Sequence, residues 1–256
     1  MHIKGKVVIV TGAAGGIGRA LAKRFQDENA AAVVVCDIDA QGIRRVADEI
    51  GGLAAVCDVS DFNAVKQVVQ DTEKRFGRVD LYCANAGILV KGGLEASDDT
   101  WQRVMDINLM AHVHAARACL PGMIARGGGA FLNTVSAAGL LSQIGAVTYT
   151  VSKHAALGFA EWLAISHGHQ GIQVTVVCPQ AVRTTMLDGV ADGGVAGLDG
   201  VLTPAEVANV AVQALAEKRF LALPHPEVQH YFQHKAADHD RWIKAMQRLR
   251  HKFPEG

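Results

Sequence analysis

The sequence predicts an α/β fold with a doubly wound parallel β-sheet that is flanked by helices. Short apolar runs rich in β-branched residues alternate with helical stretches of about ten to fifteen residues along the 256-residue chain. The apolar runs lack a polar residue at every second position, which is typical of strands that are covered on both faces. No linker, repeat or low-complexity segment divides the chain, so we expect one domain over residues 1–256.

Seven apolar runs are the predicted strands. They are Val7–Val10, Ala31–Cys36, Leu53–Val56, Val79–Cys83, Ala130–Val135, Val174–Cys178 and Phe220–Leu223. The predicted helices lie between them, at about residues 19–25, 41–50, 62–76, 100–126, 149–167 and 204–218. Thr203, Pro204 and Glu206 have the pattern of a capping box at the last of these helices. Residues 180–200 are glycine-rich and aperiodic, which predicts a mobile lid.

Composition and charge argue against several classes of partner. Lys plus Arg and Asp plus Glu both number 25, and no basic stripe is present, so we expect neither nucleic acid nor a membrane as a partner. No apolar run approaches the roughly eighteen residues of a membrane span. The short apolar run after Lys4 and Lys6 has no convincing cleavage site, so we expect a cytoplasmic protein.

Cysteine and histidine spacing predicts no metal site. The cysteines are Cys36, Cys57, Cys83, Cys119 and Cys178. None forms a Cys-x-x-Cys pair, and their odd number and apolar neighbours indicate buried thiols in a reducing compartment. His230, His234 and His239 lack supporting carboxylates or thiols, which favours solvated helix histidines over metal ligands.

Tyr149 and Lys153 are the residues that most directly indicate catalysis. On a helix, their four-residue spacing places them one turn apart on one face. A neighbouring ammonium favours the phenolate, which would bring the pKa of the tyrosine down from about 10 toward neutral pH. Ser136, thirteen residues before Tyr149, is a candidate to hold the oxygen that exchanges the proton. The alternative is a chance pair on an amphipathic helix, because the motif is short.

Candidate ligand residues follow almost every predicted strand. In doubly wound folds, ligands bind beyond the carboxyl ends of the strands. The residues at those ends are the glycine turn at 11–18 and Asp37, Asp58, Asn85, Ser136 and Pro179. A common site at one edge of the sheet explains six features that would otherwise be unrelated.

The glycine turn predicts a dinucleotide site of the Rossmann type. Gly12, Gly16 and Gly18 lie between a strand and a helix, where backbone amides bind a pyrophosphate and glycine allows it to approach. A tight turn without a ligand is the alternative. Asp37 ends the second strand, where a carboxylate binds ribose hydroxyls and repels a 2′-phosphate. No lysine or arginine occupies Ala14 or directly follows Asp37, so NAD is preferred over NADP. Asp37 could instead cap the next helix, although Asp39 is better placed for that role.

With these motifs, residues 5–223 resemble a classical short-chain dehydrogenase/reductase. Thr11-Gly12-x-x-x-Gly16-x-Gly18 is similar to the cofactor motif of that family, and Asn108 matches an asparagine of its catalytic tetrad beside Ser136, Tyr149 and Lys153. The resemblance implies that the cofactor-binding residues are Gly12, Gly16, Ile17, Gly18, Asp37, Asp58, Val59, Asn85, Ala86, Gly87, Tyr149, Lys153, Pro179, Val182 and Thr184. Gln180 departs from the family, which usually has glycine after this proline.

The resemblance implies hydride transfer between nicotinamide C4 and a secondary alcohol or ketone. Tyr149 would exchange the hydroxyl proton, Lys153 would lower the tyrosine pKa and bind the nicotinamide ribose, and Asn108 would hold a water. Candidate substrate residues are Ser136, Ala138, Gln143, Tyr149, Gln180 and the lid at 182–201. Their small or apolar character favours a neutral, fairly hydrophobic substrate, and Arg183 is expected to be solvated rather than to bind an anion.

A C-terminal extension at about residues 226–252 is unusual for the family. We expect one helix over Glu227–Lys252 that packs over the substrate side or onto a partner subunit. Family members pair through helices that correspond to 108–126 and 149–167, which implies a homodimer or homotetramer. Two other functions share the dinucleotide site: an epimerase or dehydratase with bound NAD, and a sensor that binds dinucleotide without catalysis.

Overall fold

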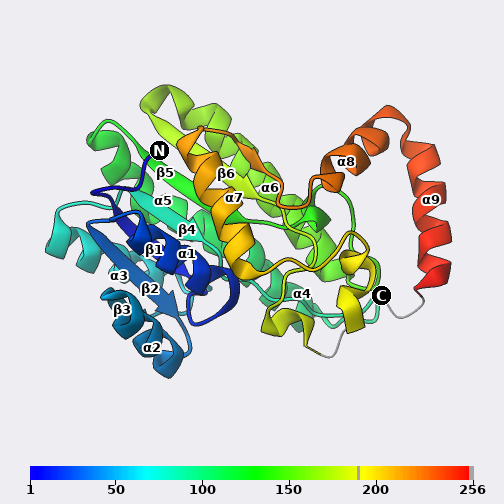
Figure 1. The fold of residues 1–256 in the computed structure, drawn as a ribbon, viewed down its shortest axis with the longest axis horizontal. Helices are drawn as coiled ribbons and strands as arrows, with labels where there is room; N and C mark the ends of the chain where they lie inside the picture. Colours follow the sequence, from blue (N-terminus) through cyan, green and yellow to red (C-terminus); the bar gives the residue numbers. More distant parts are fainter. Residues whose placement is uncertain (189–190, 254–256) are drawn as a thin grey trace.

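Seven parallel strands form one sheet in the computed structural model, which describes residues 1–188 and 191–253. The strands are β1 (Val7–Thr11), β2 (Ala32–Asp37), β3 (Leu53–Val56), β4 (Leu81–Ala84), β5 (Gly129–Thr134), β6 (Ile172–Val177) and β7 (Leu221–Ala222). Their order is β3-β2-β1-β4-β5-β6-β7 (Figure 1). The order reverses between β1 and β4, which is the position where such sheets bind ligands. The predicted doubly wound parallel sheet is therefore confirmed.

Helices cover both faces of the sheet. On one face lie α1 (Gly16–Asp27), α2 (Ala40–Ile50) and α7 (Pro204–Ala216), and on the other lie α3 (Phe62–Phe76), α5 (Ala111–Ala125) and α6 (Val147–His167) (Figure 1). Alternate residues of a strand enter the two cores, because successive side chains point to opposite faces. In β1, Val8 and Val10 pack with α1 and α7, whereas Ile9 packs with α3, α5 and α6.

Polar caps begin three of the predicted helices. Asp39 accepts hydrogen bonds from the amides of Gln41 and Gly42 and begins α2, so Asp39 and not Asp37 is the cap. Asp61 caps α3 in the same way. Thr203 and Glu206 form the predicted capping box of α7. These caps satisfy first-turn amides that would otherwise lack partners.

The predicted helix over residues 100–126 contains a π-helical turn. α4 (Asp98–Met105) continues into the π turn η1 (Asp106–Met110) and then into α5. Single π turns occur often at functional sites, because the extra residue redirects side chains. Asn108 lies in this turn with a fully buried side chain.

The C-terminal extension consists of two helices, not one. α8 (Glu227–Ala237) ends at Asp238, whose backbone is extended (φ −152°, ψ 92°), and α9 (His239–Lys252) follows. The Asp238 carboxylate accepts a hydrogen bond from the amide of Arg241, so this residue ends one helix and caps the next. Figure 1 shows α8 and α9 extending away from the layered body.

The segment predicted as a lid contains short 3₁₀ turns, η4 (Thr185–Leu187) and η5 (Ala191–Gly197), while residues 189 and 190 lie outside the described residues. Two further 3₁₀ turns are η2 (Ala137–Gly139) and η3 (Gly168–Gln170). All five cysteines are free and buried, as the sequence predicts. No helix of the described residues is both long and apolar enough to cross a membrane.

Candidate active site

A cavity of about 1000 Å³ lies at the carboxyl edge of the sheet. Most of the predicted site residues line it: Gly12, Gly16, Ile17, Asp37, Asn85, Ala86, Gly87, Ser136, Ala138, Gln143, Tyr149, Lys153, Pro179, Gln180, Val182 and Thr184. Gly18, Asn108, Asp58 and Val59 do not belong to the lining. The Asp58 carboxylate instead accepts hydrogen bonds from the amide and hydroxyl of Ser60. Its contact with a cofactor therefore stays a prediction.

The glycine turn packs tightly on one side and opens to the cavity on the other. A Cβ on Gly12, where φ is +63°, would lie 2.8 Å from the Ala86 Cα, and one on Gly18 would lie 2.1 Å from the Gly12 carbonyl oxygen. A Cβ on Gly15 would meet nothing within 4 Å. Gly15 lines the cavity and begins α1 without a side-chain cap. The first-turn amides of α1 are thus suited to a phosphate group.

Two carboxylates line the cavity near this turn. Asp37 accepts hydrogen bonds from the amides of Ala14 (3.1 Å) and Asp39 (3.1 Å), which holds it at the end of β2. Asp39 also belongs to the lining. Among the described lining residues, the basic side chains are His234, Arg241 and Lys153, which belong to α8, α9 and α6. The end of the cavity beside β2 is therefore acidic.

A chain of hydrogen bonds joins the glycine turn to Lys153. The Thr11 hydroxyl donates to the Cys83 carbonyl oxygen (3.2 Å) and accepts from the Asn85 amide (3.0 Å). The Asn85 side chain donates to the Thr11 carbonyl oxygen (3.0 Å) and accepts from the Thr134 hydroxyl (2.9 Å). Lys153 Nζ then donates to the Thr134 carbonyl oxygen (3.2 Å). The ends of β1, β4 and β5 are thereby fixed relative to α6.

Asn108 holds the loop after β4 against α6. Its amide oxygen accepts from the Ile88 amide (2.9 Å), and its nitrogen donates to the Ile88 carbonyl oxygen (2.9 Å) and to the Ser152 hydroxyl (3.0 Å). A Cβ on Gly87 would lie 3.3 Å from both Asn108 Oδ1 and Lys153 Nζ. Gly87 is therefore closely packed against both polar groups, and a side chain at this position would crowd them.

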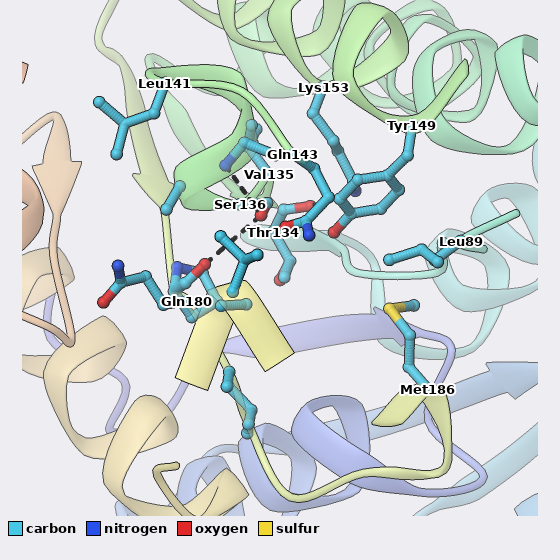
Figure 2. Close-up of a pocket in the computed structure, with 18 of the residues that line it drawn as sticks. Leu89, Thr134, Val135, Ser136, Leu141, Gln143, Tyr149, Lys153, Gln180 and Met186 are labelled. Atoms are coloured by element: carbon cyan, nitrogen blue, oxygen red, sulfur yellow. Dashed lines mark hydrogen bonds between the residues drawn. The ribbon is translucent and has the colours of Figure 1, made fainter. Parts of the chain in front are cut away.

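Tyr149 and Ser136 face each other in the cavity, with Lys153 behind them on α6 (Figure 2). The Ser136 oxygen accepts from the Ala138 amide (3.1 Å) and donates to the Pro179 carbonyl oxygen (3.4 Å). These bonds anchor the serine hydroxyl at the end of β5. Ser136, Tyr149 and Lys153 therefore all line the same cavity.

The pKa of Tyr149 does not fall in this structure as the sequence suggests. Burial raises the pKa of Tyr149, and the adjacent Ser136 hydroxyl partly opposes this rise. Burial also lowers the pKa of Lys153 from 10.5 to about 8. Lys153 Nζ lies 5.5 Å from the centre of the tyrosine ring, against its face. Desolvation, which the sequence spacing does not reveal, is therefore the larger effect on the phenol.

Gln180 links three parts of the molecule. Its backbone amide donates to His225 Nδ1 (3.2 Å), and its side-chain nitrogen donates to the Asp199 carboxylate (2.9 Å). The Tyr231 hydroxyl donates to the other oxygen of Asp199 (2.9 Å). The residue that departs from the family pattern thus joins the end of β6, the lid segment and α8. Among the described residues, the buried Gln180 Oε1 has no hydrogen-bond partner.

Several of these residues were not identified from the sequence. Thr134 lies near the end of the predicted strand that precedes Ser136, and this position is the signal that could identify it, whereas Thr11 already begins the predicted glycine turn. The sequence places Asp199 within the lid at 182–201, and Tyr231 and Trp242 within the C-terminal extension expected over the substrate side or on a partner subunit. It carries no local signal for the individual contacts of these three side chains. Within the described part of the chain, no group of three or more His, Cys, Asp or Glu residues could hold a metal ion.

A family model described as short chain dehydrogenase matches residues 6–193. The chain belongs to this family. It is 34% identical over 193 residues to meso-2,3-butanediol dehydrogenase of Serratia marcescens, covering 74% of this chain and 76% of that protein. It is also 34% identical over 234 residues to epidermal retinol dehydrogenase 2 of Homo sapiens, covering 87% and 75%.

A solved structure of a short chain dehydrogenase/reductase from Burkholderia phymatum, in complex with NAD, superimposes with a TM-score of 0.86. It is 27% identical, and the match covers 94% of this chain and 96% of that one. The 3-ketoacyl-(acyl-carrier-protein) reductase from Brucella melitensis, complexed with NADH, gives a TM-score of 0.81 at 28% identity, over 86% and 96% of the two chains. As a member of the short-chain dehydrogenase family, the protein is an oxidoreductase.

Replacement of the buried Lys153 should change how stability depends on pH. Because the pKa of Lys153 is about 8 in the folded protein against 10.5 ordinarily, the unfolded chain binds more protons between these pH values. The contribution of Lys153 to the free energy of unfolding therefore rises with pH across that window, by roughly 3 kcal/mol in all. Denaturant unfolding from pH 7.5 to 10.5 should show this rise in wild type relative to Lys153→Met.

Other buried groups titrate in both proteins, so the difference between them isolates Lys153. Lys66 is exposed on α3, and Lys66→Met should keep the wild-type dependence on pH. If the free energy of unfolding changed with pH in the same way in wild type and in Lys153→Met, the claim that burial lowers the pKa of Lys153 would be contradicted.

Proposed function

We propose that the protein is an NAD-dependent dehydrogenase that transfers hydride between nicotinamide C4 and a neutral, fairly hydrophobic secondary alcohol or its ketone. The observation that carries the proposal is the convergence of Tyr149, Ser136 and Lys153 in one cavity with the glycine turn and Asp37. The relatives named as dehydrogenases and the neighbouring structures with NAD and NADH support it. Oxidation of the alcohol is the expected physiological direction.

The cofactor residues fit a nicotinamide dinucleotide without a 2′-phosphate. The open first turn of α1 would hold the pyrophosphate through backbone amides, and Asp37 would accept hydrogen bonds from the adenosine ribose. A 2′-phosphate would meet Asp37 and Asp39, and the basic side chains of the described lining, Lys153, His234 and Arg241, belong to α6, α8 and α9 rather than to this end of the cavity. When bound, the nicotinamide ring supplies the hydride acceptor or donor.

The remaining predicted cofactor residues are assigned to the other parts of the dinucleotide. Thr184 lies against the glycine turn, since a Cβ on Gly16 would be 3.0 Å from its methyl group. We assign the adenine to Asp58 and Val59 and the nicotinamide carboxamide to Val182 and Thr184. The other cofactor contacts are assigned to Gly12, Ile17, Gly18, Asn85, Ala86, Gly87, Tyr149, Lys153 and Pro179.

Tyr149 would accept the hydroxyl proton during oxidation, while Ser136 holds the alcohol oxygen by hydrogen bonding. Lys153 would carry a positive charge beside the phenol and bind the nicotinamide ribose. We assign to Asn108 a water that passes protons to solvent through Lys153. Burial raises the pKa of Tyr149, so oxidation should accelerate as pH rises and more phenolate forms.

The substrate residues are Ser136, Ala138, Gln143, Tyr149 and Gln180, together with the lid segment. Gln180 Oε1 is buried and has no hydrogen-bond partner among the described residues, so we propose that it accepts from a substrate hydroxyl when the loop adjusts to a ligand. On assembly, Trp162 and Ile165 of α6 are 56% and 82% exposed, which favours a homodimer or homotetramer built on this helix. The five buried thiols agree with the reducing conditions of the cytoplasm.

Loss of the Tyr149 hydroxyl should abolish most turnover. Tyr149→Phe removes the proton acceptor, so kcat with a secondary alcohol should fall by about 10²-fold or more. The Kd for NAD, measured by calorimetry, should change little. Tyr82→Phe removes a hydroxyl on β4 outside the cavity and serves as the control. A Tyr149→Phe enzyme that kept most of its turnover would refute the assigned mechanism.

Asp37 should determine the choice between NAD and NADP. Asp37→Ser removes the carboxylate that repels the 2′-phosphate and binds the ribose. The Kd for NAD should rise about tenfold, because a charge-assisted hydrogen bond contributes about 1.5–3 kcal/mol. The Kd for NADP should fall, which titration of both cofactors would measure. Asp48→Ser, on the exposed side of α2, should leave the ratio of the Kd for NADP to the Kd for NAD unchanged. If Asp37→Ser also left this ratio unchanged, Asp37 would not determine the choice of cofactor.

A further inference from the structure

The last helix, α9, carries an apolar face that the rest of the protein buries only in part. It has 14 residues, none of them buried, and packs mainly on α8. A helix of this length is marginal alone in water, so stable helices of this kind cover an apolar face. Trp242, Met246 and Leu249 follow each other at intervals of four and three residues, which places them on one side of the helix.

This apolar face is turned toward the active-site cavity. Trp242, Met246 and Leu249 all line the cavity that contains Tyr149. By contrast, Ile243 does not line it and is 41% exposed. Because this face is turned toward the cavity, we favour a ligand inside the cavity as its contact over a second protein molecule outside it.

Two contacts hold the α8–α9 unit over the cavity. Lys235 Nζ donates to the carbonyl oxygens of Leu140 (2.7 Å) and Leu141 (3.2 Å), which follow η2. The same ammonium lies 5.0 Å from the centre of the Trp242 ring, within the range of a cation–π contact. On the other side, the bond from Tyr231 to Asp199 ties α8 to the lid segment. The wall formed by α9 is thus attached to the body at two places.

The cavity wall between the reaction centre and α9 is also largely apolar. Leu141 and Met186 face the cavity around Ser136 and Tyr149 (Figure 2), and Leu198 belongs to the same lining. Leu198 is 55% exposed and Met186 is 41% exposed, so both offer apolar surface that a ligand could bury. An apolar ligand in this space would contact the body and α9 together.

We propose that α9 forms the outer wall of the substrate site and selects alcohols with an elongated apolar body. The carbinol end would lie at Tyr149 and Ser136, and the far end would pack against Trp242, Met246 and Leu249. This inference rests on the proposed dehydrogenase function. It adds to that function a specificity that the catalytic residues do not provide, because they contact only the carbinol end.

A series of alkan-2-ols from butan-2-ol to dodecan-2-ol, each oxidised with NAD, tests the proposal. In wild type, kcat/KM should rise roughly threefold per methylene until the site is filled, since each buried methylene adds favourable transfer free energy. The triple variant Trp242→Ala, Met246→Ala, Leu249→Ala should lose most of this rise, so that its ratio of kcat/KM for dodecan-2-ol to kcat/KM for butan-2-ol falls far below the wild-type ratio. Ile243→Ala, on the outer side of α9, should keep the full rise.

A conservative variant separates loss of contact from loss of structure. Trp242→Leu with Met246→Leu keeps an apolar face and should retain most of the dependence on chain length. Hydrogen exchange gives a second measurement, because dodecan-2-ol with NAD should slow exchange in residues 239–252 of wild type but not of the triple variant. Light scattering should give the same mass for both proteins.

Different failures have different meanings. The role of α9 would be overturned if kcat/KM in wild type did not depend on the chain length of the alcohol, or if the triple variant kept the wild-type rise in kcat/KM. A triple variant with reduced mass would also overturn it, because the apolar face would then cover a second subunit. If wild type oxidised none of the alcohols, the proposed function would fail, and protection of residues 239–252 by dodecan-2-ol would still decide whether α9 binds apolar ligands.

Discussion

The hydrogen bonds that cross the ends of β1, β4 and β5 are the constraint on which the site depends. Thr11, Asn85 and Thr134 are bonded in series, and Lys153 joins the series from α6. Since the strands are parallel, their ends expose unpaired backbone groups at one edge, and these side chains satisfy several of them. The same bonds set where the glycine turn lies relative to Lys153. One network thus positions the residues that we propose to bind the cofactor and to transfer the proton.

Burial gives the reacting groups their properties. Tyr149 and Lys153 are 7% and 3% exposed, and desolvation moves their pKa values in opposite directions, each toward the neutral form. Two buried groups that resist ionisation are stabilised by polar partners, here the Ser136 hydroxyl and the Thr134 carbonyl oxygen. A charge that develops in this cavity is weakly screened, so hydrogen bonds placed before the reaction act strongly on it.

Much of the fold and the inner site could be predicted from the sequence, because they depend on local patterns. Strand runs, caps and the residues after each strand place Asp37, Asn85, Ser136 and Pro179 at one edge. The π turn at Asn108 could not be predicted, since helical periodicity continues through it. Nor could the break at Asp238, because the apolar positions before and after it fit one helix.

The outer site depends on tertiary contacts between distant segments. Gln180 could be recognised as a departure from the family, but its bond to Asp199 and the link onward to Tyr231 span 19 and 32 residues of sequence. Helical spacing predicts a lowered Tyr149 pKa, and this prediction is wrong for the structure, because spacing indicates proximity to Lys153 and says nothing about desolvation. Burial is a property of the whole fold and appears only when the elements are packed.

Transfer of label from substrate to cofactor tests the central claim most directly. A secondary alcohol with deuterium on its carbinol carbon would be incubated with the enzyme and NAD, and the products examined by NMR. Direct hydride transfer from the carbinol carbon, with Tyr149 accepting the hydroxyl proton, predicts a ketone and reduced cofactor with deuterium at nicotinamide C4, in equal amounts. Deuterium found in water, or kept in a rearranged product with no net reduction of NAD, would contradict the account.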